Sequence, residues 1–259
     1  MNDFLNKFFA LEGKVAALTG AGGHLIGAFS LGLAKAGVRV AVLDVDFRKA
    51  EAIAAKIQAE GGEAMPLRVD VTCKGDFQAA LQKTLERWNR IDILVNGAGI
   101  NAPTPFLEIA IEEWNRILAV QLGGTMLGCQ VFGDRMVQQG RGVIINISSA
   151  SAGPPLSKAF TYSVAKAGIK NLTQNLAREW ATKGVRVNAL RPGFFPTEWN
   201  KRNFLTPDRV QAILNHTPMS RFGEPEELLG AVLWLCSDAA TFVTGAEIAV
   251  DGGFSAMTI

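Results

Sequence analysis

The chain has 259 residues, 48% of them hydrophobic and 19% charged, which is typical of a globular protein with a sizeable core. Its net charge of +2 is too small, and its basic residues too scattered, to indicate nucleic acid or an anionic membrane as a partner. No apolar run reaches the length of a membrane span, and two histidines in the whole chain argue against a zinc site, so we expect no metal.

The three cysteines, Cys73, Cys129 and Cys236, lie far apart and form neither a CxxC pair nor an even-numbered framework. We therefore expect reduced thiols buried in the core of a cytoplasmic protein. The first residues lack the apolar core and the small-residue cleavage site of a signal peptide, which agrees with that location.

A glycine turn follows the first predicted strand, which covers residues 14–18. The turn contains Gly20, Gly22 and Gly23 and leads into a helical pattern that ends near Ala36. Such a turn lets backbone N–H groups at a helix N-terminus approach a pyrophosphate. A lone glycine cluster is weak evidence, but a strand on each side strengthens it.

Asp44 ends the second predicted strand, residues 38–43, and stands 24 positions after Gly20. This separation is near the roughly 20 residues expected for an acid that binds the adenosine ribose of a dinucleotide. A carboxylate there repels a ribose phosphate and favours NAD over NADP, whereas the nearby Arg48 weakens that preference.

The alternation of helices and strands continues to the end of the chain. Further helices are predicted over residues 48–59, 76–88, 112–137, 162–183 and 226–237, and further strands over 63–69, 91–95, 142–147, 185–190 and 247–250. The helical pattern over residues 112–137 is interrupted by Gly123-Gly124. Seven alternating strands predict an α/β fold, a single Rossmann-type doubly wound domain over residues 1–259 with a parallel sheet. Ligands of such sheets bind outside the carboxyl ends of the strands. Those ends carry Gly20, Asp44, Asp70, Asn96, Ser149 and Pro192.

Tyr162, the only tyrosine, precedes Lys166 by four residues, which places both side chains on one helix face. An ammonium beside a phenol favours the phenolate, so we expect a pKa below about 10 and proton exchange with a substrate oxygen. Ser149, at the end of a buried strand, is placed to hydrogen-bond the same oxygen. Taken alone, the spacing is more often that of an ordinary helical pair with a solvated lysine.

These segments together resemble the short-chain dehydrogenase/reductase family along nearly the whole chain. The matching pieces are Thr19-Gly20, Asp70-Val71, Asn96-Gly97-Ala98-Gly99, Ser149, Tyr162 with Lys166, Pro192-Gly193 and Asp251-Gly252-Gly253. The order of these pieces is far more specific than any one of them.

The resemblance implies NAD, with NADP as the alternative, lying along the carboxyl edge of the sheet. It implies cofactor contacts from Gly20, Gly22, Gly23, Asp44, Asp70, Val71, Asn96, Gly97, Ala98, Tyr162, Lys166, Pro192, Gly193 and Thr197. It further implies Tyr162 as acid/base, Lys166 as the residue that tunes it, and Ser149 as the partner of the substrate carbonyl. The cofactor carries the hydride.

The sequence departs from the family pattern in three places, the first of which covers two positions. His24 and Ile26 stand where the glycine loop usually has its last two glycines, so either the loop is displaced or the cofactor is held more weakly. His24 either touches a phosphate or caps the helix start. Gln121 replaces a common asparagine of the proton relay, which it either preserves or alters. Arg191 either faces the ligands or pairs with an acid at the sheet edge.

Residues 194–223 correspond to the variable substrate lid, which together with the C-terminal segment resembles the sugar-acid branch, including D-mannonate oxidoreductase and gluconate 5-dehydrogenase. Trp199, Asn200 and Arg202 would suit a hydroxylated carboxylate, a sugar acid or polyol, as the small-molecule substrate. The alternative is that the lid cations are solvated and Trp199 only packs. Lids diverge within families, so the resemblance leaves the substrate open.

Two other functions remain open at this stage: a non-catalytic dinucleotide-binding regulatory or scaffold protein, and an epimerase or dehydratase on a related fold. The latter usually needs a longer C-terminal substrate domain. The resemblance also implies a homotetramer. The apolar residues 246–259 would either be buried at a subunit contact or pack as an edge strand.

Overall fold

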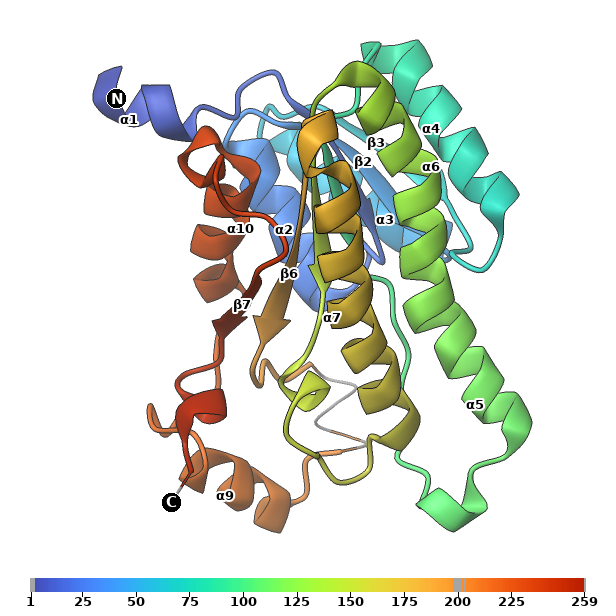
Figure 1. Cartoon of the computed structure of the whole chain (residues 1–259), viewed down its shortest axis with the longest axis vertical. Coiled ribbons are helices and arrows are strands. Elements are labelled where there is room, and N and C mark those ends of the chain that lie inside the picture. The colour runs from blue at the N-terminus through green and yellow to red at the C-terminus, as the bar shows by residue number, and fades with distance from the viewer. Residues whose placement is uncertain (1–2, 198–201, 203, 259) are drawn as a thin grey trace.

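The computed structural model describes residues 3–197, 202 and 204–258. Its centre is a sheet of seven parallel strands in the order β3-β2-β1-β4-β5-β6-β7 (Figure 1). The strands are β1 (Val15–Thr19), β2 (Arg39–Asp44), β3 (Ala64–Arg68), β4 (Ile93–Asn96), β5 (Gly142–Ile147), β6 (Val185–Pro192) and β7 (Glu247–Val250). The predicted α/β fold with a seven-stranded parallel sheet is confirmed, and the predicted strand bounds differ by no more than two residues at either end.

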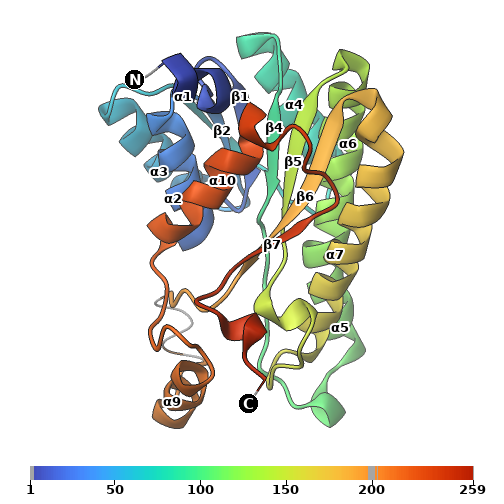
Figure 2. The same ribbon diagram turned by 60° about the vertical axis from the view of Figure 1, so that its left-hand side comes forward.

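Helices cover both faces of the sheet, as the two views show (Figures 1 and 2). One face carries α2 (His24–Lys35), α3 (Phe47–Ala59) and α10 (Leu229–Cys236), and the other carries α4 (Lys74–Trp88), α5 (Ile111–Leu118), α6 (Gly124–Gln139) and α7 (Phe160–Trp180). The short α1 (Asp3–Phe9) lies at the N-terminus, and α9 (Pro207–Asn215) lies beyond the carboxyl ends of the strands.

Strand β1 shows why the sheet is covered on both sides. All five of its residues are buried, and its four apolar residues alternate between two hydrophobic clusters. Ala16 and Leu18 pack with α2 and α10, whereas Val15 and Ala17 pack with the α4 and α6 side. A strand buried on both faces reads as a continuous apolar run, which is the pattern of a central parallel strand.

The helix predicted over residues 112–137 with a break at Gly123-Gly124 is continuous. A π-helical turn, Ala119–Gly123, joins α5 to α6 without a break. The predicted interruption at these two glycines is therefore wrong, because both keep helical backbone angles. Gly124 is buried against Val71, a contact that leaves no room for a side chain.

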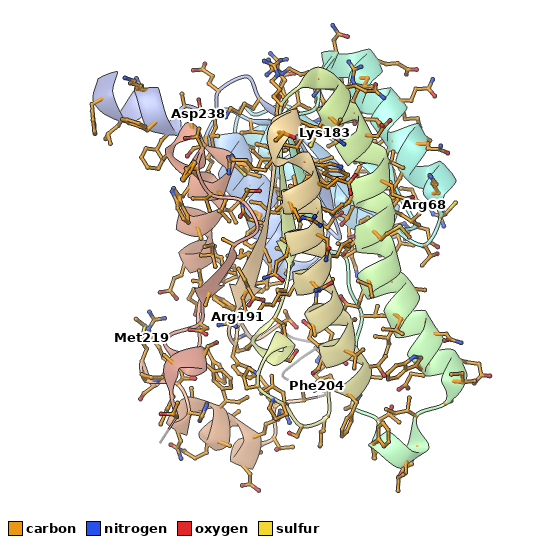
Figure 3. The ribbon with its side chains drawn as sticks, in the orientation of Figure 1. Arg68, Lys183, Arg191, Phe204, Met219 and Asp238 are labelled. Carbon is orange, nitrogen blue, oxygen red and sulfur yellow. The ribbon has the colours of Figure 1, made fainter. Side chains whose placement is uncertain are left out.

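The register of the sheet brings the strand ends to one edge. Asn96 pairs with Thr19 on one side and with Asn146 on the other, so β1, β4 and β5 end at the same level. Figure 3 shows Arg191 at this end of the molecule, together with Phe204 and Met219, while Lys183 and Asp238 lie at the opposite end. The residues that the sequence predicted to be functional therefore lie near the carboxyl ends of the strands, on the side of the sheet where α9 is found.

Candidate active site

Tyr162 and Lys166 lie on the first two turns of α7, facing the end of β5. The Lys166 ammonium is 5.4 Å from the centre of the Tyr162 ring. Lys166 is only 3% exposed, and its Nζ donates a hydrogen bond of 2.6 Å to the backbone oxygen of Ile147. Tyr162 is half-buried and its phenol is hydrogen-bonded to Ser149. The structure therefore brings Ser149, Tyr162 and Lys166 together.

The expected lowering of the tyrosine pKa is wrong. Burial raises the pKa of Tyr162 above its ordinary value of 10, and the hydrogen bond from Ser149 only partly offsets this. Burial also lowers the pKa of Lys166 to about 7, so near neutral pH the lysine carries only a fraction of its charge. Its short bond goes to a backbone oxygen and not to the phenol, which further weakens its effect on Tyr162.

The Ser149 hydroxyl is oriented by a second serine that the sequence analysis did not single out. The backbone N–H of Ser151 donates to Ser149 Oγ at 3.2 Å, and the two hydroxyl oxygens are 3.1 Å apart. Ser151 is 4% exposed and lines the same cavity as Ser149 and Tyr162. Its position two residues after Ser149 was the only signal in the sequence.

The glycine turn after β1 forms a tight cradle against the end of β4. Gly20 has a φ of +70°, and a Cβ atom there would lie 2.7 Å from the Ala98 Cα. Only glycine tolerates both conditions. The Thr19 hydroxyl, also missed as a site group, accepts hydrogen bonds from the Gly97 and Ala98 N–H groups at 3.0 and 3.3 Å. The turn and the end of β4 therefore form one rigid surface.

Asp44 lies at the end of β2 beside this cradle and is 9% exposed. Its Oδ2 accepts from Gly22 N–H and its Oδ1 from Asp46 N–H, each at 2.9 Å. Each carboxylate oxygen keeps a lone pair for a further donor, such as a ribose hydroxyl. The position and chemistry of Asp44 fit the adenosine ribose of a dinucleotide.

The two departures in the glycine loop have a structural explanation. Ile26 is 5% exposed, and its side chain lies against Gly97, where any Cβ atom would collide with it. Because Gly97 has no side chain, the Ile26 side chain fits against it. Ile26 therefore need not displace the glycine turn. His24 is the exposed first residue of α2, after the N-cap Gly23, which makes no side-chain capping bond.

The remaining cofactor candidates divide into cavity-lining and supporting residues. A cavity of about 550 Å³ is lined by Gly97, Gln121, Tyr162, Lys166 and Thr197, among others. Gly193 and Pro192 line the neighbouring cavity around Ser149.

Asn96 is a supporting residue. Its side chain is 4% exposed and donates a hydrogen bond to Asn146 Oδ1 at 2.9 Å, which ties the end of β4 to the end of β5. Val71 is 7% exposed within the core, and Asp70 accepts two bonds from Thr72 that lower its pKa.

Gln121 lies in the π-helical turn and is 1% exposed. Its Nε2 donates to the backbone oxygen of Ile100 at 2.7 Å, while its Oε1 is buried without a hydrogen-bond partner. A buried acceptor without a partner costs free energy, and π-turns occur frequently at functional sites. Gln121 is one of the residues that line the cavity of Tyr162 and Lys166.

Arg191 pairs with an acid at the sheet edge, which was one of its two predicted roles. Its Nη1 lies 3.1 Å from Glu247 Oε2 on β7. Glu247 also accepts from the Ser148 hydroxyl at 2.7 Å and lies 3.3 Å from Lys170 Nζ. The network joins β5, β6, β7 and α7 directly behind Ser149.

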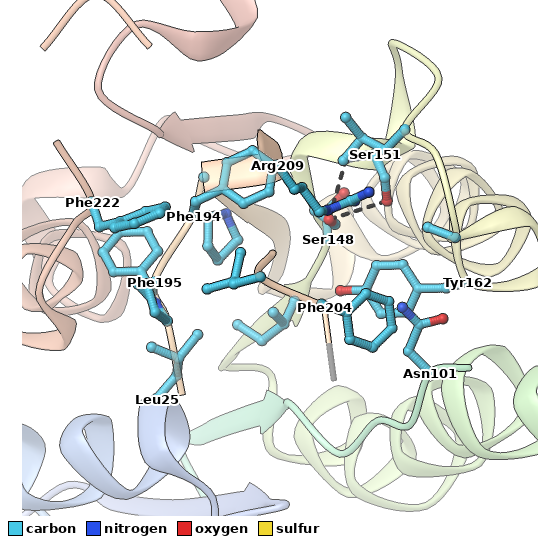
Figure 4. A pocket seen from close by; sticks show the side chains of 18 residues that line it. Leu25, Asn101, Ser148, Ser151, Tyr162, Phe194, Phe195, Phe204, Arg209 and Phe222 are labelled. Carbon is cyan, nitrogen blue, oxygen red and sulfur yellow. Dashed lines mark hydrogen bonds between the residues drawn. The ribbon is translucent and has the colours of Figure 1, made fainter. Parts of the chain in front are cut away.

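The cavity above Ser149 and Tyr162 has a volume of about 230 Å³ (Figure 4). Most of its described lining is apolar, with Leu25 near the glycine turn and Phe194, Phe195, Phe204 and Phe222 from the lid. Its polar lining consists of Asn101, Ser148, Ser149, Ser151, Tyr162 and Arg209. Asn101 and Arg209 were not predicted, although Arg209 belongs to the expected lid.

Of the three substrate candidates of the sequence, Trp199 and Asn200 lie outside the described residues. Arg202 is exposed and is not among the lining residues given above. Cys129 and Cys236 are buried, whereas Cys73 is exposed, so the prediction of a core thiol is wrong for Cys73. In the described part of the chain, no group of three or more potential metal ligands comes together. None of the helices described is long and apolar enough to cross a membrane.

Comparison with known proteins agrees with this geometry. A family model described as enoyl-(acyl carrier protein) reductase matches residues 27–255, which is most of the chain. The chain belongs to the short-chain dehydrogenase/reductase family, and it is an oxidoreductase that uses NAD(P).

Relatives of this family member act on several substrates. D-threitol dehydrogenase of Mycolicibacterium smegmatis is 36% identical over 247 residues, covering 95% of each chain. The 5-keto-D-gluconate 5-reductase of Escherichia coli K12 is 33% identical, covering 96% of this chain and 98% of the relative. The structure of a gluconate 5-dehydrogenase of Burkholderia cenocepacia, solved with NADP and tartrate, matches with a TM-score of 0.94 at 32% identity. The match covers 98% of this chain and 100% of that one.

Proposed function

We propose that this short-chain dehydrogenase/reductase transfers a hydride between a nicotinamide cofactor and the secondary alcohol or ketone of a sugar acid or polyol. The observation that carries the proposal is the convergence of Ser149, Tyr162 and Lys166 on two adjoining cavities at the carboxyl edge of the sheet. The named relatives that act on D-threitol, 5-keto-D-gluconate and gluconate support the substrate class.

In this proposal the protein supplies orientation and proton transfer, while the bound nicotinamide supplies or accepts the hydride. The Ser149 hydroxyl, oriented by Ser151, hydrogen-bonds the substrate oxygen. Tyr162 gives a proton to that oxygen during reduction and takes it during oxidation. Lys166 binds the nicotinamide ribose beside Tyr162. Gln121 Oε1 accepts a hydrogen bond from a water molecule, which relays a replacement proton towards Tyr162.

The cradle of Gly20, Gly22 and Gly23 borders the pyrophosphate, and Asp44 binds the adenosine ribose. Because the Asp44 carboxylate would repel a ribose phosphate, we propose a preference for NAD over NADP. The rest of the proposed dinucleotide site consists of Asp70, Val71, Asn96, Gly97, Ala98, Pro192, Gly193 and Thr197. We further propose a single domain over residues 1–259 with a lid at 194–223, a cytoplasmic location and a homotetramer.

The test compares the wild type with Tyr162→Phe on a panel of aldonates, alditols and their keto forms, with NAD and NADP. Removing the phenolic proton should lower kcat by about 10²- to 10⁴-fold, the usual range for a general acid or base. Binding of NADH, measured by fluorescence titration, should stay within about threefold. The wild type should turn over its substrate with a higher kcat/KM for NAD than for NADP.

Two outcomes would contradict the proposal. If Tyr162→Phe retains the wild-type rate, Tyr162 is not the acid or base. If the wild type binds NADH and turns over nothing in the panel, the sugar-acid or polyol assignment fails, and the non-catalytic alternative gains support for the first time.

A further inference from the structure

Arg209 is the only charged side chain among the described residues that line the cavity above Ser149 and Tyr162 (Figure 4). It lies on α9, whereas Ser149 and Tyr162 come from the end of β5 and the start of α7. Within the described part of the lid, one cation thus lines a cavity whose other described polar groups are hydroxyls and an amide.

The Arg209 guanidinium has no counter-ion in the described part of the chain. Its Nη1 donates to Ser157 Oγ at 2.6 Å and its Nη2 to the Ser157 backbone oxygen at 2.9 Å, and both acceptors are neutral. Partial burial lowers the pKa of Arg209, and no carboxylate among the described residues offsets this effect. A guanidinium has five N–H donors, so several remain for a ligand.

A partly desolvated cation without a counter-ion costs free energy, which an anion bound in the same cavity would recover. The planar fork of arginine matches a carboxylate or a phosphate in a bidentate arrangement. The apolar walls from the lid phenylalanines exclude water from this contact and thereby strengthen it.

We propose that Arg209 binds the carboxylate of the substrate, so that the enzyme selects a hydroxy or keto acid over a neutral polyol of the same length. This inference rests on the proposed function and narrows its substrate class. A phosphorylated polyol offers the same anionic chemistry, and the experiment separates it from a carboxylate. Arg209 replaces the exposed Arg202 as the cation of the lid that meets the substrate.

The experiment measures kcat/KM for each aldonate of the panel, for the alditol of the same configuration and for that alditol's terminal phosphate. The variants are Arg209→Gln, Arg209→Lys and Ser157→Ala, with Arg202→Gln as a matched arginine control in the same lid. Binding of NADH to each variant is measured separately.

We expect Arg209→Gln to lower kcat/KM for the aldonate by about 10- to 100-fold, mainly through KM, because a charge-assisted contact is lost. The alditol should change by less than about threefold. Arg209→Lys should restore part of the aldonate activity. Ser157→Ala and Arg202→Gln should affect acid and alditol equally and weakly, and NADH binding should be unchanged in all variants.

An equal loss for acid and alditol in Arg209→Gln would overturn the proposal, because the bond to Ser157 would then be only a structural link between α9 and the loop before α7. A selective loss for the phosphate alone would assign the cation to a phosphate ester. Weaker NADH binding by Arg209→Gln would show that the Arg209 cation contacts the cofactor and not the substrate.

If no compound is turned over, calorimetry on the NADH-loaded enzyme decides. Aldonate binding that Arg209→Gln weakens would support the proposal even though the proposed reaction fails. Absence of such binding would overturn both.

Discussion

Lys166 is buried at 3% exposure with one hydrogen bond, to the Ile147 oxygen, and this environment lowers its pKa to about 7. Below pH 7 the lysine is charged in the folded and the unfolded chain, so the cost of burying its charge is fully present. Between pH 7 and its ordinary value of 10.5, the unfolded chain binds more protons than the folded protein, so stability rises with pH.

We therefore expect Lys166→Met to be more stable than the wild type at pH 6.5, with a difference that shrinks by about 1 kcal/mol per pH unit above pH 7. Urea unfolding at pH 6.5, 8 and 9.5 measures this difference. Lys83→Met, on an exposed position of α4, is the matched control and should differ from the wild type by a constant amount. If the difference in unfolding free energy between Lys166→Met and the wild type does not change with pH, burial of the Lys166 charge does not destabilise the protein.

At the scale of elements, helix α6 packs closely on the end of β4. A Cβ atom on Gly128 would collide with Asn96 Oδ1, and the Asn96 side chain is held in place by its 2.9 Å bond to Asn146. Glycine inside a helix usually costs about 1 kcal/mol relative to alanine, so its presence here reflects the contact with β4.

Gly128→Ala should lower the free energy of unfolding by about 1–2 kcal/mol, because the cost of overpacking exceeds the gain in helix propensity. Gly230→Ala provides the comparison, since Gly230 lies on α10 with nothing within 4 Å of an added Cβ. That substitution should stabilise the protein by up to about 1 kcal/mol. Equal effects of the two substitutions in urea unfolding would disprove the close contact as the reason for Gly128.

At the scale of the whole molecule, β7 is the last strand of the sheet, and it pairs only with β6 among the described strands. Unpaired strand edges are commonly covered by another element or another chain. An edge strand was one of the two roles predicted for the C-terminal segment, and burial at a subunit contact would add to it. This edge supports the proposed homotetramer.

Light scattering coupled to size exclusion should give a mass near four times 27.7 kDa at micromolar concentration. A mass near 27.7 kDa over the same range would remove the tetramer from the proposal. Adding NADH during the run tests whether the assembly depends on the cofactor, which the proposed arrangement does not require.

The amino-acid sequence by itself determined the class of fold, the order of the elements and the choice of Ser149, Tyr162 and Lys166 as the centre of the candidate site. Local patterns carry this information, because a buried parallel strand is a continuous apolar run and a four-residue spacing places Tyr162 and Lys166 on one helix face. The glycine turn and Asp44 were recognisable for the same reason, since each marks the end of a strand.

Only the tertiary structure decided what depends on contacts between distant segments. The raised pKa of Tyr162 follows from its burial, and burial is a property of the packed fold rather than of the spacing to Lys166. The fit of Ile26 depends on Gly97, and the pairing of Arg191 depends on Glu247, 56 residues later. Helix α9 lies beyond the carboxyl ends of the strands, and Arg209 on this helix lines the same cavity as Ser149 and Tyr162. These three residues are far apart in the sequence, so only the folded chain brings them together.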